Sequence, residues 1–155
     1  MTEEILKALM QLFGLTASLE GTSPQYRLLV ENFLKEHLNS ELSQKYLLIF
    51  EEYAKLRTVE VDEQGQKLTS MRVSSRMLVI CTHINQELTQ QQKIIVITRL
   101  IELIAADSLI TDTELEFINT IASIFNIQRP ELDNILHFVN LTRIENSFLE
   151  NTLYI

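Results

Sequence analysis

Apolar residues recur at helical spacing along most of the chain, and short polar segments separate these stretches. Residues three and four positions apart share one face of a helix, so this spacing predicts amphipathic helices. We expect helices that begin near Thr2, Pro24, Glu41, Ser70, Thr89, Thr111 and Pro130. The predicted fold class is therefore an all-α helical bundle of about seven helices.

Three of these starts carry a threonine capping signal, and Ser23 is a serine cap in front of Pro24. Thr2, Thr89 and Thr111 each offer a hydroxyl that can accept a hydrogen bond from a free amide of the first turn. Gln92 and Glu114 stand three residues after the second and third of them, which is the spacing of a capping box. We expect both boxes to form.

The helix that opens at Thr89 is the most apolar, with aliphatic residues around most of its circumference. Such a helix belongs at the centre of a bundle. The residues predicted to be central are Ile97, Leu100, Ile101, Ile104, Ile118 and Ile121. The same spacing assigns further core residues to the other helices, among them Leu28, Leu42, Leu78 and Leu115.

Residues 58–69 lose the helical periodicity. The segment Val59-Glu60-Val61 alternates, and Gln64-Gly65-Gln66 is typical of a turn. This part of the chain is interpreted as a connector, either mobile or folded as a small hairpin.

An offset of 88 residues brings two parts of the chain into register. Leu12-Phe13 then aligns with Leu100-Ile101, and Val30 aligns with Ile118. The same offset aligns the hydroxyl caps Ser23 and Thr111, and this agreement of caps and apolar positions favours an internal duplication. We predict a single domain over residues 1–155, built from half-repeats at roughly 1–57 and 89–145.

The second half-repeat contains the segment 103–114, which resembles the signature of the TerB-like family, named for a tellurite-resistance protein. Asp107, Ile110, Thr111 and Glu114 match that pattern. Ser108 stands where the family usually has glycine. In the first half-repeat, Gln25 and Tyr26 occupy the place where a carboxylate would be expected. The resemblance implies a helical TerB-like domain over the whole chain.

The resemblance also implies a metal site at Asp107, Asp112 and Glu114, because acidic residues at these helix junctions are associated with the family. Hard divalent cations bind where several oxygen ligands converge. The competing interpretation is structural: Glu114 completes the capping box, and both it and Asp112 suit the positive end of a helix. Asp107 can equally satisfy free amides in the turn.

The charge balance excludes some classes of binding partner. The chain carries 13 Lys and Arg against 21 Asp and Glu, a net charge of −8, with no basic cluster. Nucleic acid and anionic membrane surfaces are therefore unsuitable partners. Divalent metals and basic proteins stay open. No apolar run approaches the length of a bilayer span, so we expect no membrane insertion of this chain.

No catalytic signature is present, and we predict neither an enzyme nor a cofactor. Cys81 is the only cysteine, which favours a reducing compartment, and its apolar surroundings indicate a small buried hydrophobe. His37, His83 and His137 stand alone, without a second ligand at metal-binding spacing. A glycine-rich phosphate loop is also missing from the sequence.

The leading hypothesis is a cytoplasmic, non-enzymatic interaction or regulatory domain of the TerB-like type with a protein partner. The resemblance connects such domains with stress response or with a membrane-associated assembly. The alternative is a divalent-metal sensor that uses the acidic residues named above. The apolar ending at residues 153–155 suits the N-terminal part of a longer protein.

Overall fold

The structure is a computed structural model that describes residues 2–20, 24–55, 60–61, 67–68, 71–106 and 109–140. Its elements are α1 (Glu3–Glu20), α2 (Pro24–His37), α3 (Ser40–Ala54), β1 (Glu60–Val61), β2 (Lys67–Leu68), α4 (Met71–Glu87), α5 (Gln90–Ile104) and α6 (Asp112–Ile124). Residues 129–140 form a seventh helix. The prediction of an all-α bundle of about seven helices is confirmed.

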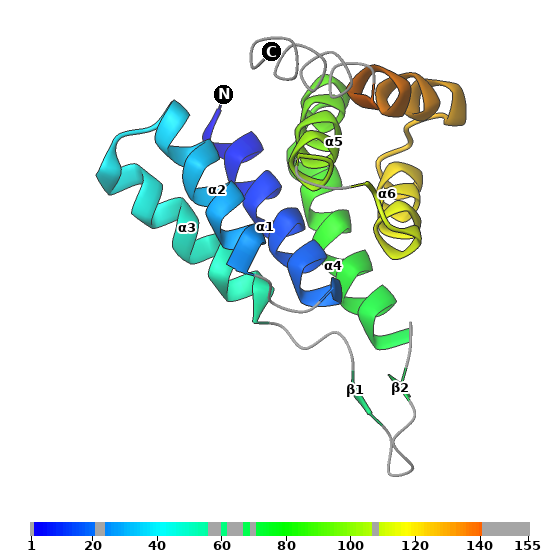
Figure 1. Ribbon diagram of the computed structural model, residues 1–155. Helices are drawn as coiled ribbons and strands as arrows, with labels where there is room; N and C mark the ends of the chain where they lie inside the picture. The colour runs from blue at the N-terminus through cyan, green and yellow to red at the C-terminus, as the bar shows by residue number, and fades with distance from the viewer. Residues whose placement is uncertain are drawn as a thin grey trace, which may run out of the picture.

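Helix α1 lies at the middle of the bundle. In Figure 1 the pair α2 and α3 stands on one side of it and α5 on the other, with α6 beyond α5. The extensive contacts of α1 with both α3 and α5 agree with this view. The two halves of the chain therefore meet where α1 packs on α5.

The predicted threonine caps form, and Ser23 lies outside the described residues. Thr89 Oγ1 accepts from the Gln92 amide at 3.2 Å, and Gln92 Oε1 accepts from the Thr89 amide at 2.9 Å. Thr2 Oγ1 accepts from the Ile5 amide at 3.3 Å. Each bond satisfies an amide that has no partner within its own helix, so these starts are local consequences of the sequence.

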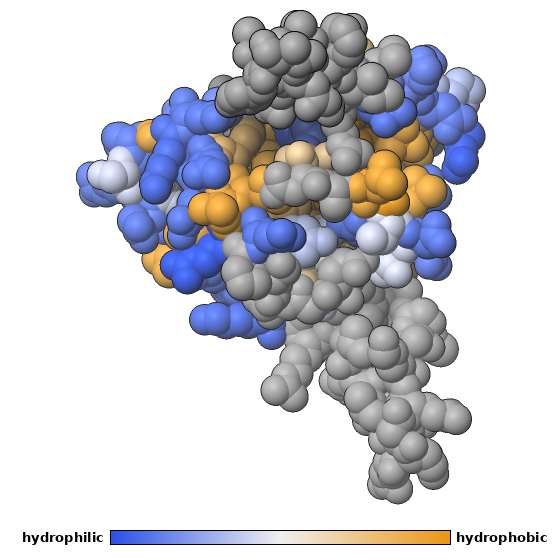
Figure 2. Space-filling view, in the orientation of Figure 1, coloured by the Kyte–Doolittle hydropathy of each residue, from blue (hydrophilic) through white to orange (hydrophobic). Residues whose placement is uncertain are grey.

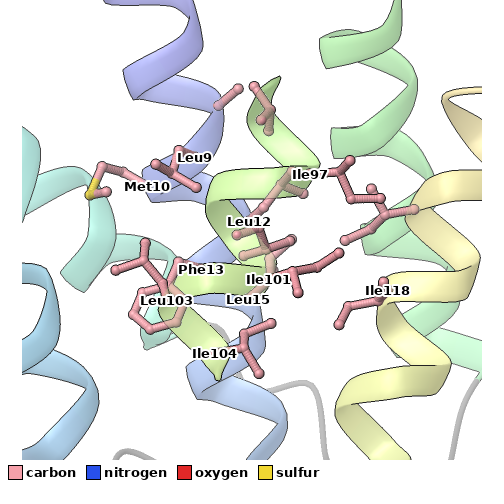
Figure 3. Close-up of a cluster of buried hydrophobic side chains, with 14 of the residues drawn as sticks. Leu9, Met10, Leu12, Phe13, Leu15, Ile97, Ile101, Leu103, Ile104 and Ile118 are labelled. Atoms are coloured by element: carbon pink, nitrogen blue, oxygen red, sulfur yellow. The ribbon is translucent and has the colours of Figure 1, made fainter. Parts of the chain in front are cut away.

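The core confirms the six residues predicted to be central, all of which are buried. Figure 3 shows side chains of α1, α5 and α6 meeting in this cluster, with Leu12 and Leu15 of α1 near Ile101 of α5. Helix α1 is as central as α5, and its residues from Leu12 to Ala17 are all buried. Two central helices, rather than one, thus lie at the middle of the core.

Some residues assigned to the core are exposed instead. Leu28 exposes 57% of its surface, and the other members of this group are Leu42, Leu78 and Leu115. On α2, α3 and α6, the buried residues include Val30, Leu47 and Phe117. Each helix on the outside of the bundle buries only a narrow stripe, so an apolar residue beside that stripe faces solvent.

Helices α1 and α3 approach closely at Gly14. A Cβ added there would lie 2.7 Å from the Phe50 carbonyl oxygen and 2.7 Å from Tyr53 Cβ. Nearby, Gln11 Nε2 donates to the Tyr53 hydroxyl at 3.1 Å. A residue without a side chain is therefore required where these two helices cross.

The connector contains the small hairpin that its alternation allowed. Strands β1 and β2 pair antiparallel, with Glu60 opposite Leu68 and Val61 opposite Lys67. The turn predicted at residues 64–66 lies outside the described residues.

Helix α6 ends in a Schellman motif, which directs the chain into the seventh helix. Asn126 takes the left-handed conformation with φ 55°, and the Ile127 amide donates to the Ala122 carbonyl at 2.9 Å. Gln90, the first residue of α5, donates its side-chain amide to the Phe125 carbonyl at 3.0 Å. This bond ties the start of α5 to the end of α6.

The substitution Gly14→Ala tests the close approach of α1 and α3. An alanine would normally favour a helix by about 0.5–1 kcal/mol over glycine, but the clash requires backbone movement. We expect a net loss of roughly 1–3 kcal/mol in the free energy of unfolding, measured by urea denaturation. Lys7→Ala on the exposed side of α1 is the control and should change it by less than about 0.5 kcal/mol. A stabilised Gly14→Ala protein would contradict the packing described.

Candidate functional site

The site begins with a buried carboxylate at the start of α6. Glu114 is the third residue of that helix and only 2% exposed. Acidic side chains are rarely buried to this degree unless they are partnered, because removing the charge from water is costly. The partners of Glu114 therefore define the local structure.

Both carboxylate oxygens of Glu114 accept a hydrogen bond. Oε1 accepts from the Thr111 amide at 2.9 Å, and Oε2 accepts from the Tyr26 hydroxyl at 2.9 Å. In return, Thr111 Oγ1 accepts from the Glu114 amide at 3.1 Å. The first and third of these bonds are the predicted capping box, and the second joins α6 to α2.

Aromatic contacts continue from Tyr26 into the first half of the bundle. Its ring meets Phe13 of α1 edge to face, with centroids 5.5 Å apart. Phe13 in turn stacks on Phe50 of α3 at 5.6 Å. The corner between α5 and α6 is thus linked to α1, α2 and α3 by one row of packed side chains.

The pairing of Tyr26 with Glu114 was not predicted. These residues are 88 positions apart, the same offset that aligns the two halves. The internal duplication predicts a carboxylate at positions 25–26, where the sequence has Gln25 and Tyr26. The structure instead places a phenol hydroxyl there, facing the carboxylate of the other half. Only the shared offset could have indicated the contact.

The three residues of the metal hypothesis have different positions. Asp107 lies outside the described residues. Asp112 is exposed in the first turn of α6, and Glu114 is buried with both oxygens engaged. Within the described part of the chain, no three His, Cys, Asp or Glu side chains gather as metal ligands would. Capping accounts for Glu114, and a metal role stays a prediction.

The remaining candidate residues are Cys81 and the three histidines. Cys81 is fully buried, and burial raises the pKa of its thiol from 9.0 to about 12, which keeps the thiol protonated at neutral pH. The ring of His37 packs against Phe33 with centroids 4.6 Å apart, and its Nδ1 lies 2.8 Å from the Phe33 carbonyl oxygen. His83 and His137 are exposed on their helices.

Apolar and acidic side chains share the surface around this corner. Leu109 exposes 75% of its surface, Leu115 is exposed, and Ile110 is half-buried. The carboxylate-bearing residues Asp112 and Glu116 are also exposed. We call these five residues the α6 entry surface. Figure 2 shows apolar surface over this region, with hydrophilic surface at its sides.

The position of these residues follows from the local helix start. With Thr111 as the N-cap, Ile110 and Leu115 hold the two positions of a hydrophobic staple. Asp112 and Glu116 are four residues apart and so lie on one side of α6, next to Leu115. The capping box therefore also orients the α6 entry surface.

Comparison of the chain with protein-family models, with curated proteins and with solved structures returns no match. The resemblance to the TerB-like family therefore stays a prediction that rests on residues 103–114. None of the described helices has both the length and the apolar character needed to cross a membrane.

Calcium titration distinguishes capping from metal binding. A calcium ion that bound only the folded state at one hundred times its Kd would add about 2.7 kcal/mol, or roughly 5–10 °C in Tm. Because capping accounts for Glu114, we expect the Tm to change by less than about 1 °C between chelator and millimolar calcium. The Tm of the Asp107→Ala variant should be equally insensitive to calcium. A rise of several degrees in the wild type that Asp107→Ala abolishes would instead establish a metal site.

Proposed function

We propose that the chain is a non-enzymatic interaction or regulatory domain of the TerB-like type and that it contacts its partner through the α6 entry surface. The observation that carries this proposal is the exposure of Leu109, at 75% the most exposed of the large hydrophobic residues described. Leu109 precedes the half-buried Ile110 in the chain, and Ile110 and the exposed Leu115 hold the two positions of a hydrophobic staple. Contiguous exposed apolar residues typically mark a contact site.

The hydrogen bonding beneath the α6 entry surface favours a role in binding. Leu109 lies on the short link between α5 and α6, and Glu114 holds the end of that link to α2 through its bond to Tyr26. A surface whose backbone is already ordered loses less conformational entropy when a partner binds. The buried carboxylate therefore serves the interaction by positioning Leu109 and Leu115.

The environments of the candidate nucleophile and bases also favour a binding role. The Cys81 thiol is inaccessible and protonated, and the His37 ring is engaged with its own helix. Nucleophilic catalysis needs a nucleophile and a base within hydrogen-bond reach of each other.

The TerB-like assignment is proposed together with the half-repeats. Helices α2 and α6 begin at Pro24 and Asp112, 88 residues apart, and the aligned pair Val30 and Ile118 is fully buried. The central helices α1 and α5, which also occupy equivalent places in the two halves, pack against each other. An internal duplication accounts for both correspondences.

Site-specific photocrosslinking in the native cell tests the proposed function. A photoreactive amino acid at position 109 should yield a discrete crosslinked species, because that side chain projects from the proposed contact surface. The measurement is the mobility shift of the chain, with mass spectrometry of the captured partner. Adding Leu115→Asp should reduce the yield severalfold, since a buried carboxylate at an interface is costly.

The matched control places the same photoreactive group at position 48. Leu48 is 63% exposed on α3, on the opposite side of the bundle from α6 (Figure 1). It should give little or none of the species obtained at position 109. Equal yields at both positions, or a yield at 109 that Leu115→Asp leaves unchanged, would contradict the assigned surface.

A further inference from the structure

We infer that the partner segment bound by the α6 entry surface is a cationic amphipathic helix. Its apolar side would cover Leu109 and Leu115, and its Lys or Arg side chains would lie against Asp112 and Glu116. This inference rests on the proposed function and adds the chemical class of the partner.

The charge at the surface supports this class. Helix α6 contains no lysine or arginine. In the described part of the chain, neither Asp112 nor Glu116 takes part in an ion pair. Nearby acidic residues differ: Glu102 pairs with Arg99 at 2.9 Å, and Asp133 pairs with Arg129 at 3.2 Å. The two carboxylates of the α6 entry surface are thus available for cations of another molecule.

Capping explains only one of these two carboxylates. Asp112 is in the first turn of α6, where a negative charge stabilises the positive end of the helix. Glu116 lies beyond the first turn, where that effect has largely faded. It lies exposed beside Leu115 without an ion-pair partner among the described residues, and its charge is complementary to a basic partner.

The spacing indicates a helical partner. Leu115 and Glu116 stand three and four residues after Asp112, so acidic and apolar groups form one stripe along the first two turns of α6. A helix lying along that stripe presents its own apolar and basic residues at the same spacing. Nucleic acids and anionic lipids would meet these carboxylates with like charge.

Binding of two synthetic peptides tests the inference. One is an 18-residue amphipathic helix of leucine and lysine, and the other has glutamate at every lysine position. In amide NMR titrations of the whole chain, we expect the lysine peptide to shift resonances from Leu109 to Glu116 and the glutamate peptide to cause no shifts. The Kd of the lysine peptide should also rise with salt, as screening weakens the charge contacts.

The double variant Asp112→Asn/Glu116→Gln should weaken binding of the lysine peptide about fivefold, the range expected for two exposed charge contacts. Both side chains are exposed, and loss of the Asp112 charge at the start of α6 should lower the melting temperature by only about 1–4 °C. Glu41→Gln/Glu52→Gln removes the same charge from exposed positions on α3 and should weaken binding less than twofold.

Three results would overturn the inference. Equal weakening by the two double variants, with shifts spread over α3, would show only general attraction to an acidic protein. Failure of the lysine peptide to bind, while crosslinking at position 109 still captures a partner, would refute the cationic class and leave the proposed function standing. Loss of both signals would refute the proposed function as well.

Discussion

The burial of Glu114 is the constraint on which the arrangement of the α6 entry surface depends. A carboxylate that is only 2% exposed has to find hydrogen-bond donors inside the protein. It finds one in its own helix start, at the Thr111 amide, and one in the other half of the chain, at the Tyr26 hydroxyl. A local capping motif thereby becomes a long-range connection between α2 and α6.

Packing in the core holds the residues of this connection in place. Tyr26 packs on Phe13, and Phe13 stacks on Phe50, so the hydroxyl that binds Glu114 belongs to a ring held by three helices. Helix α1, which carries Phe13, packs on α3 at Gly14 and on α5 through its other side. Leu109 and Leu115 are therefore presented from a rigid base, although they lie at its exposed edge.

Most of the fold could be predicted from local features of the sequence, because helix caps and apolar spacing involve residues only a few positions apart. The boxes at Thr89 and Thr111 and the burial of Ile101 followed directly from them. The exposure of Leu28 and Leu115 did not, since periodicity shows which residues share a face but not how wide the buried stripe is. The bond between Tyr26 and Glu114 joins residues far apart in sequence, so the sequence identified the carboxylate and missed its partner.

A double-mutant cycle between Tyr26 and Glu114 tests the central claim most directly. The free energy of unfolding would be measured by urea denaturation for wild type, Tyr26→Phe, Glu114→Gln and the double variant. A buried hydrogen bond to a carboxylate predicts a coupling energy of about 1–3 kcal/mol, with the double variant less destabilised than the sum of the single ones. Additive effects within about 0.3 kcal/mol would show that this bond does not connect α2 with α6, and would contradict the account.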